Sequence, residues 1–442
     1  MILPYFVSTC LWLLLVVLVP APCFAQDDEP SVAAASAEAT MIERNGMPTT
    51  GTPVPALRAF DAKIVALMKR ENIPGGALAI VENGRLIYAR GYGYADRDKK
   101  IPVLPTSLFR LASVSKPITA VAVMSVVQDP RYRLSLDTKV FPLLGLKPFL
   151  KPGRQMDARL NDITVRHLLE HAGGWDRDKS GDIMFKHFQV AQEMKIASPP
   201  DHTSLIRWAL GQPLDFEPGA RHAYSNFGYC VLGRVIEKAT GLPYETYVQK
   251  HVFAPMGITQ MQVGKGRQTE RAQGEVCYYD RKNRTARSVF TGEGDVSLPY
   301  AFASPQTMDA HGGWIASVVE MARFAAYLDM AATARRPSLL RPESLADLYA
   351  RPPAPLGREP NGSLSAAYYA LGWMVRPVGQ NGQANYWHGG GMPGTSTILV
   401  RLAGGRSWVL LFNQGTDADI DSLLHQAAAE VTRWPTNNLF RL

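Results

Sequence analysis

Cysteine is scarce in this chain of 442 residues, which has four in total. Two of them, Cys10 and Cys23, lie within the first 25 residues, so a chain cleaved after that segment keeps only Cys230 and Cys277. Two thiols allow at most one intramolecular disulfide, which excludes a disulfide-framed fold. Cys230 lies in an apolar helical stretch, where a buried free thiol is the commoner state, and we expect both thiols to be structural.

A concentrated basic stripe is also missing, although the net charge is +8. The excess is dispersed, and its densest patch, Arg281, Lys282 and Arg284, has Asp280 beside it. Proteins that bind nucleic acid usually carry such a stripe or a recognisable module, so we predict no nucleic-acid partner. With 46% hydrophobic and 9% aromatic residues, the composition is that of a globular protein rather than a disordered, collagen-like or multi-span membrane chain.

Several active-site signatures are absent from the sequence. It contains no Gly-x-Ser-x-Gly elbow, no phosphate-binding Gly/Lys loop and no Cys-x-x-Cys pair. His167, Glu170, His171 and Asp176 lie close together in the chain, but their spacing does not fit a zinc helix such as His-Glu-x-x-His. We therefore expect neither a metal nor an organic cofactor.

The first 25 residues contain no charged side chain, and residues 5–19 are almost wholly apolar. Small residues at Cys23 and Ala25 follow, so the segment resembles a secretory signal, although its usual basic start is missing. We predict an exported protein, periplasmic or secreted. An uncleaved anchor is the alternative, against which the apolar run is short for the roughly 20 residues of a spanning helix. Contact with a membrane is expected only if this segment is retained.

The next part of the chain changes character twice. Residues 26–53 are rich in Ala, Ser, Thr, Asp and Glu without an apolar period, which predicts a flexible tether. Residues 55–72 have the apolar spacing of a helix. Two β-rich runs, 77–81 and 86–89, then flank Asn83-Gly84, the strongest short-range signal for a hairpin.

The same pattern of strands returns near the C-terminus. Three further strands are predicted at 369–377, 396–402 and 407–412, before a helix over 417–434. We therefore expect one sheet lobe made of residues 54–110 and 367–442. Residues 111–366 show mainly helical patterns with long Pro/Gly-rich connections, which predicts a helical lobe inserted between the two halves of the sheet lobe.

A serine and a lysine lie at the predicted start of a helix. Pro117 cannot donate to a carbonyl four residues back, which places Ser113 in the first turn, at the positive end of the helix dipole. Residues three apart share a helix face, so Lys116 can reach the Ser113 hydroxyl. The apolar run 118–127 implies burial, which lets a lysine serve as a base. Ser-x-x-Lys alone is a weak pattern, and Ser115 is an alternative capping residue.

Two more motifs follow in order, Tyr224-Ser225-Asn226 and His388-Gly389-Gly390. With the segments 91–98, 108–117 and 163–174, they resemble the serine β-lactamase and penicillin-recognising family. The branch it is most similar to contains class C β-lactamases, D-Ala-D-Ala carboxypeptidases, D-aminopeptidases and β-lactamase-like esterases. The resemblance spans about residues 55–434. It implies an α+β fold with an antiparallel sheet of about five strands flanked by helices, and an inserted, mostly helical lobe.

The resemblance also implies roles for these residues. Ser113 would attack an ester or amide carbonyl and form an acyl-enzyme. Lys116 and Tyr224 would share the proton network that activates it, and the sequence leaves open which of them holds the proton. Asn226 would orient Lys116 and donate to a substrate amide. The backbone N–H groups of Ser113 and Gly391 would bind the oxyanion.

The third motif departs from the β-lactamase form. His388 stands where many β-lactamases have lysine, which replaces a permanent cation by a group expected to titrate near pH 6.5. Gly389 replaces the usual threonine and its hydroxyl. Together with Gly390 and Gly391, it opens the strand edge that we expect to line the substrate site. These changes favour a bulkier or less anionic acyl group over penicillins. The alternative is that His388 is a packed strand histidine.

We predict a cofactor-free serine hydrolase acting on a small molecule or a peptide, most similar to the esterases and D-amino-acid-type peptidases of the family. A true β-lactamase or a D-Ala-D-Ala carboxypeptidase is the alternative. A non-catalytic protein that binds envelope peptides is a further one. The segment 171–175 matches a loop that frames the pocket in this family, and we expect it and the segment 311–314 to be structural.

Overall fold

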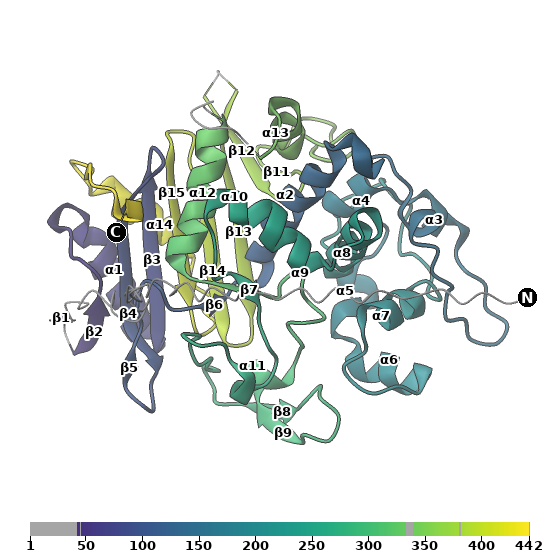
Figure 1. The fold of residues 1–442 in the computed structure, drawn as a ribbon, viewed down its shortest axis with the longest axis horizontal. Helices are drawn as coiled ribbons and strands as arrows, with labels where there is room; N and C mark the ends of the chain where they lie inside the picture. Colours follow the sequence, from purple (N-terminus) through teal and green to yellow (C-terminus); the bar gives the residue numbers. More distant parts are fainter. Residues whose placement is uncertain (1–41, 45, 333–338, 380–381, 442) are drawn as a thin grey trace, which may run out of the picture. The chain divides into compact units, whose positions relative to one another are not determined.

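The computed structural model describes residues 42–44, 46–332, 339–379 and 382–441 (Figure 1). The predicted signal segment, residues 1–25, lies outside the described residues, and so do residues 26–41 of the predicted tether. Within that tether segment, β1 (Ile42–Arg44) pairs with β2 (Met47–Thr50), and β2 pairs with β4 (Arg85–Asp96). The predicted tether is therefore too long, because its C-terminal part adds strands to the sheet.

An antiparallel sheet of ten strands contains all five predicted strands. The strands run in the order β1-β2-β4-β3-β15-β14-β13-β12-β11, and β5 pairs with β4 off this path. The remaining bounds are β3 (Gly75–Glu82), β5 (Ile101–Pro102), β11 (Tyr368–Tyr369), β12 (Met374–Val378), β13 (Gln383–Met392), β14 (Thr395–Arg401) and β15 (Arg406–Phe412). The α+β class is confirmed, and the sheet is larger than the five strands expected.

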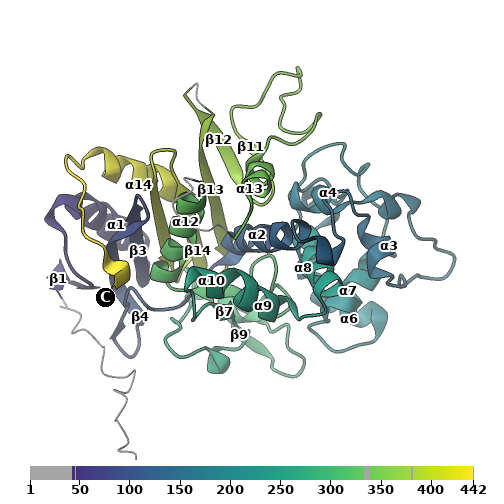
Figure 2. The same ribbon diagram turned by 45° about the horizontal axis from the view of Figure 1, so that its top comes forward.

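Helices cover both faces of the sheet (Figure 2). On one face, α1 (Arg58–Glu71) and α14 (Ile420–Ala429) pack with Leu78 and Ile80 of β3, while the alternate residues of that strand turn to the other side. The second face carries α12 (Val318–Ala332), which packs on β3 and β15. This helix lies in the segment 111–366 that we expected to form the helical lobe, so the sheet lobe takes a helix from inside the insertion.

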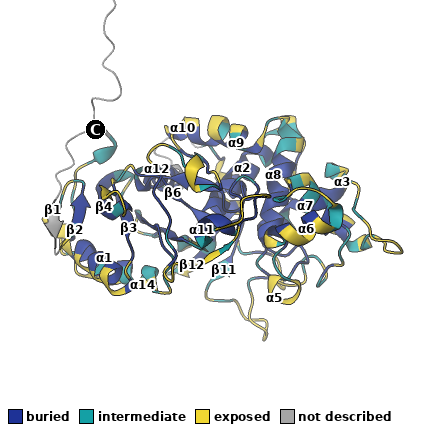
Figure 3. Ribbon diagram, turned by 90° about the horizontal axis from the view of Figure 1, so that it is seen from below, coloured by how far each residue is buried: buried dark blue, intermediate teal, exposed yellow. Residues whose placement is uncertain are grey.

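The rest of the insertion is mainly helical and is built around α2 (Ser115–Val127) and α8 (Asn226–Thr240), which pack on each other. Nearly every residue of α2 is buried, as its all-round apolar pattern requires (Figure 3). The other helices are α3 (Val140–Leu144), α4 (Val165–Leu169), α5 (Arg177–Ser180), α6 (His187–Met194), α7 (His202–Ala209), α9 (Tyr244–Tyr247), α10 (Ala254–Met256), α11 (Leu298–Ala301) and α13 (Pro342–Tyr349).

Two small sheets complete the insertion. One has the order β6-β10-β7, formed by Phe109–Arg110, Trp314–Ala316 and Gln262–Val263, and the other pairs β8 (Thr285–Arg287) with β9 (Asp295–Ser297). Cys230 and Cys277 are both buried free thiols, as expected. Within the described ranges, none of the helices combines the length and the apolar character needed to cross a bilayer.

Candidate active site

Ser113 lies in a short 3-10 turn, η3 (Ala112–Val114), that leads into α2. Its side chain is half-buried while its neighbours on both sides are buried, so the hydroxyl faces accessible space. Ala112, with φ of 48°, adopts the left-handed conformation, which costs a residue with a Cβ roughly 1–2 kcal/mol. Such strain is typical of residues that position a functional side chain. Ser115, the alternative cap, is fully buried and its hydroxyl has no hydrogen-bond partner among the described residues.

The backbone beside the serine is tied to two sheets. The N–H of Leu111 donates to the carbonyl of Trp314 in β10 at 2.9 Å. The carbonyl of Leu111 accepts from the hydroxyl of Thr397 in β14 at 2.8 Å. The turn that carries Ser113 is therefore held in place from both sides.

Lys116 meets three oxygen atoms. Its Nζ lies 3.1 Å from the Ser113 Oγ, 2.7 Å from the Asn226 Oδ1 and 2.8 Å from the carbonyl oxygen of His311. The side chain is 0% exposed. The structure thus brings together the serine, the lysine and the asparagine, although Asn226 lies 110 positions after Lys116 in the chain.

The environment of Lys116 favours its neutral form. Burial lowers the pKa of Lys116 well below its usual range, the carboxylate of Asp182 opposes that shift, and Arg177 adds to it. A neutral amine has two N–H bonds and one lone pair. The Asn226 and His311 oxygens can only accept, so they take the two hydrogens. The lone pair is then left for the Ser113 hydroxyl, which is the arrangement a base requires.

Tyr224 completes the group around the serine. Ser225 caps α8 by accepting from the Gly228 N–H at 3.2 Å, which fixes Tyr224 just before the helix and Asn226 at its first residue. The Tyr224 hydroxyl is close enough to Ser113 to interact with it electrostatically. Burial raises the pKa of Tyr224 above its ordinary value, although Ser113 and Arg177 oppose the shift. The phenol therefore keeps its proton near neutral pH.

Asp182 and Arg177 are site residues that the sequence analysis missed. Asp182 Oδ2 accepts from the Asn226 Nδ2 at 2.7 Å, which turns the amide so that its oxygen faces Lys116. The Arg177 guanidinium lies over the Tyr224 ring, 4.8 Å from its centroid. Both come from residues 176–186, which follow the family-like segment 163–174 and contain no motif themselves. The sequence offers no signal that would have identified them.

His388 is a packed strand histidine, the alternative left open by the sequence. It is only 5% exposed, and burial lowers its pKa to about 3. Its Nδ1 lies 2.7 Å from the Gly389 carbonyl, which can only accept, so Nδ1 carries the proton. Its Nε2 therefore accepts from the Tyr369 hydroxyl at 3.0 Å. The prediction of a group titrating near pH 6.5 was wrong, because the ring packs inside the molecule.

The glycines of the third motif border the serine in different ways. A Cβ on Gly390 would come within 2.4 Å of the Leu111 carbonyl oxygen and 3.1 Å of the Ser113 nitrogen, so only glycine lets the strand approach the η3 turn. A Cβ on Gly391 would meet no atom within 4 Å, and this residue is exposed. The pairing of β13 with β12 ends at Trp387, so residues 388–392 of β13 extend beyond β12, beside the serine.

A family model described as beta-lactamase matches residues 60–433, most of the chain. The chain belongs to the beta-lactamase family. The match includes every residue of the site described above. It begins two residues into α1 and ends a few residues after α14, so it covers both lobes.

Relatives within and around the beta-lactamase family carry several names. Penicillin-binding protein 4* of Bacillus subtilis (strain 168) is 27% identical over 366 residues, which cover 80% of this chain and 72% of that protein. Esterase EstB of Burkholderia gladioli is 32% identical over 202 residues, which cover 45% of this chain and 49% of that protein. The match thus spans about half the length of that esterase.

Solved structures show the same fold. The D-amino acid amidase from Ochrobactrum anthropi SV3 has a TM-score of 0.62 at 20% identity, with 86% of this chain and 99% of that chain covered. EstCE1, a hydrolase with promiscuous acyltransferase activity, has a TM-score of 0.62 at 21% identity, with 86% of this chain and 100% of that chain covered. At this level of identity the likeness establishes the beta-lactamase-like fold.

Two further histidines, His171 and His311, contact residues of the site. His171 Nδ1 accepts from the Ser225 N–H at 3.1 Å, and its ring lies 4.2 Å from that of Tyr224 and 4.5 Å from that of Tyr369. Burial lowers the pKa of His171 well below its usual range. His311 takes part through its carbonyl, which accepts from Lys116. These positions agree with the structural roles expected for the segments 171–175 and 311–314.

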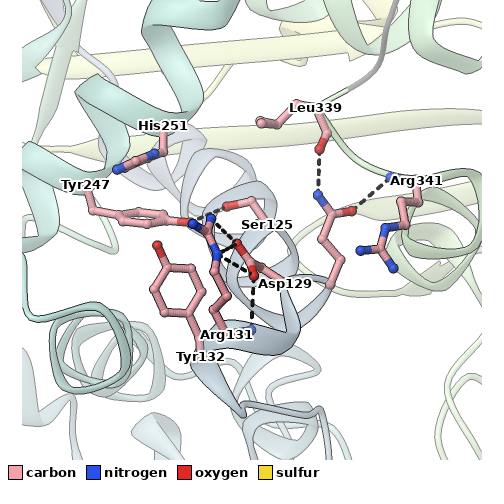
Figure 4. Close-up of a pocket in the computed structure, with 9 residues that line it drawn as sticks. Ser125, Asp129, Arg131, Tyr132, Tyr247, His251, Leu339 and Arg341 are labelled. Atoms are coloured by element: carbon pink, nitrogen blue, oxygen red, sulfur yellow. Dashed lines mark hydrogen bonds and ion pairs between the residues drawn. The ribbon is translucent and has the colours of Figure 1, made fainter.

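A pocket of about 370 Å3 is lined by the far end of α2 and should not be confused with this site (Figure 4). Ser125 at its wall lies ten residues beyond the start of α2, about 15 Å along the helix. Arg131 is engaged with Asp129 at 2.5 Å, and Gln128 bonds to the backbone of Leu339 and Arg341. The polar groups of this pocket bind one another, and the chemistry of the family lies elsewhere.

Proposed function

We propose that this protein hydrolyses ester or amide bonds through an acyl-enzyme on Ser113. The observation that carries the proposal is the geometry at Lys116, whose Nζ lies 2.7 Å from the Asn226 Oδ1, 2.8 Å from the His311 carbonyl oxygen and 3.1 Å from the Ser113 Oγ. In its neutral form the amine directs its two hydrogens to the first two oxygens and its lone pair to the Ser113 hydroxyl. Membership of the beta-lactamase family, a family of serine hydrolases, supports this assignment.

The first half of the reaction follows from these contacts. Lys116 takes the hydroxyl proton as the Ser113 Oγ bonds to the carbonyl carbon. The backbone N–H groups of Ser113 and Gly391, to which the family resemblance gives this role, would stabilise the oxyanion, and the space beside Gly391 is open. As the carbon–oxygen or carbon–nitrogen bond breaks, the protonated Tyr224 phenol gives its proton to the leaving atom and regains one from Lys116. Water then attacks the acyl-enzyme by the reverse order of transfers.

The charge at the third motif favours substrates without a carboxylate beside the reacting bond. Because burial lowers the pKa of His388 to about 3, its ring is uncharged at neutral pH and supplies no cation. Gly389 supplies no hydroxyl. Penicillins and cephalosporins carry a carboxylate, so we rank neutral esters and amides first. A D-amino-acid peptidase is the second form of the same chemistry, which the similarity in fold to a D-amino acid amidase favours.

Intact-protein mass spectrometry tests the proposal. The protein is incubated in turn with a chromogenic ester, a D-alanyl peptide, a cephalosporin and a fluorophosphonate, and the added mass is mapped to its residue. We expect a fluorophosphonate adduct on Ser113 and turnover of the ester. Turnover of the cephalosporin without any ester hydrolysis would reverse the substrate ranking. The absence of any adduct would instead favour a protein that only binds envelope peptides.

We expect Asp182→Asn to shift the pH profile and to leave the architecture of the site in place. An amide oxygen still accepts from Asn226, but the negative charge that raises the pKa of Lys116 is lost. The pKa of Lys116 then falls further, so the acidic limb of the kcat/KM profile, where Lys116 gains its proton, moves to lower pH. The measurement is kcat/KM for a chromogenic ester across pH.

The matched control for this charge change is Asp178→Asn. Asp178 is an exposed carboxylate in α5, on the same segment of chain as Asp182. We expect its profile to coincide with that of the parent protein. An acidic limb that stays in place in Asp182→Asn would mean that protonation of Lys116 does not limit the reaction.

A further inference from the structure

Two phenylalanines from different parts of the chain meet beside the candidate active site. Phe185 ends η6 (Ile183–Phe185), and Phe302 directly follows α11. Their ring centroids are 5.6 Å apart, and the rings are tilted by 39°. Phe185 is 40% exposed, which is unusual for so large an apolar side chain.

Phe185 is placed by the same contact that orients the catalytic amide. Asp182 caps η6 by accepting from the Met184 N–H at 3.0 Å, and its other oxygen accepts from Asn226. Phe185 follows Asp182 by three residues, about 6 Å along a 3-10 turn. The phenyl ring thus lies one turn away from the group that holds Asn226 against Lys116.

Phe302 comes from a different segment of the inserted region. The Pro299 carbonyl in α11 accepts from the Arg110 guanidinium at 2.6 Å, three residues before Ser113 in the chain. A Cβ on Gly394, in the turn after β13, would lie 2.7 Å from the Cβ of Pro299. Helix α11 therefore packs against both the strand edge and the chain that leads into the serine.

The apolar surface continues past this pair. Phe188 and Ile196, which are 42% and 39% exposed, follow Phe185 in and just after α6. With Phe290 they line a pocket of about 590 Å3 between α6 and the loop that joins β8 and β9. Phe185, Phe188 and Ile196 thus place three exposed large apolar side chains within one short segment. Contiguous apolar surface of this kind is typical of binding sites.

We propose that Phe185 and Phe302 form an apolar subsite that binds an aryl or medium-length alkyl group in the acyl part of the substrate. This assignment rests on the proposed function. Tyr224 must face the leaving atom in order to protonate it, and its ring is flanked by Arg177, His171 and Tyr369. Phe185 follows Asp182, which binds Asn226, the residue expected to donate to the amide of the acyl part, so the acyl chain is the part of the substrate that reaches the pair.

The test compares two p-nitrophenyl esters with the same leaving group, the acetate and the phenylpropanoate. The parent protein is expected to prefer the phenylpropanoate. We expect Phe185→Ala and Phe302→Ala each to lower the ratio of kcat/KM for the two esters by about tenfold, the scale on which apolar pockets discriminate. The kcat/KM for the acetate should change little, because that ester does not reach the pair. Phe185→Leu and Phe302→Leu should keep part of the preference.

Leu150→Ala is the matched control, since Leu150 is also 40% exposed but lies in the loop between α3 and α4. Thermal unfolding of each variant identifies any that fails to fold, and the leucine variants then decide. Equal kcat/KM for the two esters in the parent, or an unchanged ratio in both alanine variants, would overturn the subsite while leaving the acyl-enzyme proposal intact. Failure of the parent to form any adduct would count against the proposed function itself.

Discussion

Replacing Ser113 by alanine is expected to abolish the covalent adduct and to reduce kcat/KM for an ester by a factor on the order of 10⁴ or more. The Ser113 Oγ lies 3.1 Å from the Lys116 Nζ and interacts with Tyr224, so its loss removes the nucleophile and leaves the other two groups without a reactant. Residual turnover should come from binding and the oxyanion groups alone. The measurements are intact mass after fluorophosphonate treatment and initial rates of ester hydrolysis.

Ser115→Ala is the control that the chain itself supplies. Ser115 lies two residues later, is fully buried, and its hydroxyl has no hydrogen-bond partner among the residues that the structure describes. Removing an unsatisfied buried hydroxyl is neutral or slightly stabilising, so we expect full activity and an unchanged or higher Tm. A Ser115→Ala protein that loses its adduct, beside a Ser113→Ala protein that keeps it, would mean that the nucleophile is misassigned.

Lys116→Met is expected to lower kcat/KM by a factor on the order of 10³, through kcat, because methionine fills the volume of lysine but cannot take a proton. The substitution also leaves the Asn226 Oδ1 and the His311 carbonyl without their donor. Fluorophosphonate labelling should slow greatly, since it too needs an activated Ser113.

A suitable comparison is Lys179→Met. The Lys179 ammonium lies 3.8 Å from Asp215, and its side chain is 65% exposed. The substitution therefore removes a lysine that does not touch the reacting groups. Rates of this variant should match those of the parent protein. If Lys116→Met were equally active, Tyr224 would have to act as the base despite the raised pKa of its phenol.

The sequence predicted the groups whose local chemistry is strong. Pro117 fixed the start of α2, and with it the three-residue spacing that brings Lys116 to Ser113. The Tyr224-Ser225-Asn226 motif coincides with a serine cap, a feature that depends on neighbouring residues alone. The predicted strands were short runs rich in residues that favour β-structure, and each overlaps the sheet, although 369–377 is divided between β11 and β12.

What the sequence did not predict depends on contacts between distant segments. The hydrogen bond of Asp182 to Asn226 joins residues 44 positions apart, and no local pattern marks either the loop or its direction. Strand β13 contains three consecutive glycines, Gly389–Gly391, which weaken the signal of a strand. The depth at which His388 lies depends on Tyr369 and the strands around it. Its residue type suggested a group titrating near pH 6.5, and burial lowers that pKa.

The two bonds of Leu111 have a mechanical consequence. One bond joins Leu111 to β10 and the other joins it to β14. The chain just before Ser113 is therefore fixed to both lobes and is not a flexible hinge. A rigid-body motion that separated the two lobes at this point would break these bonds and move Ser113 away from Lys116 and Tyr224. New specificities in this scaffold would then arise from substitutions around a fixed serine, such as at Phe185 and Phe302, rather than from a change in the separation of the two lobes.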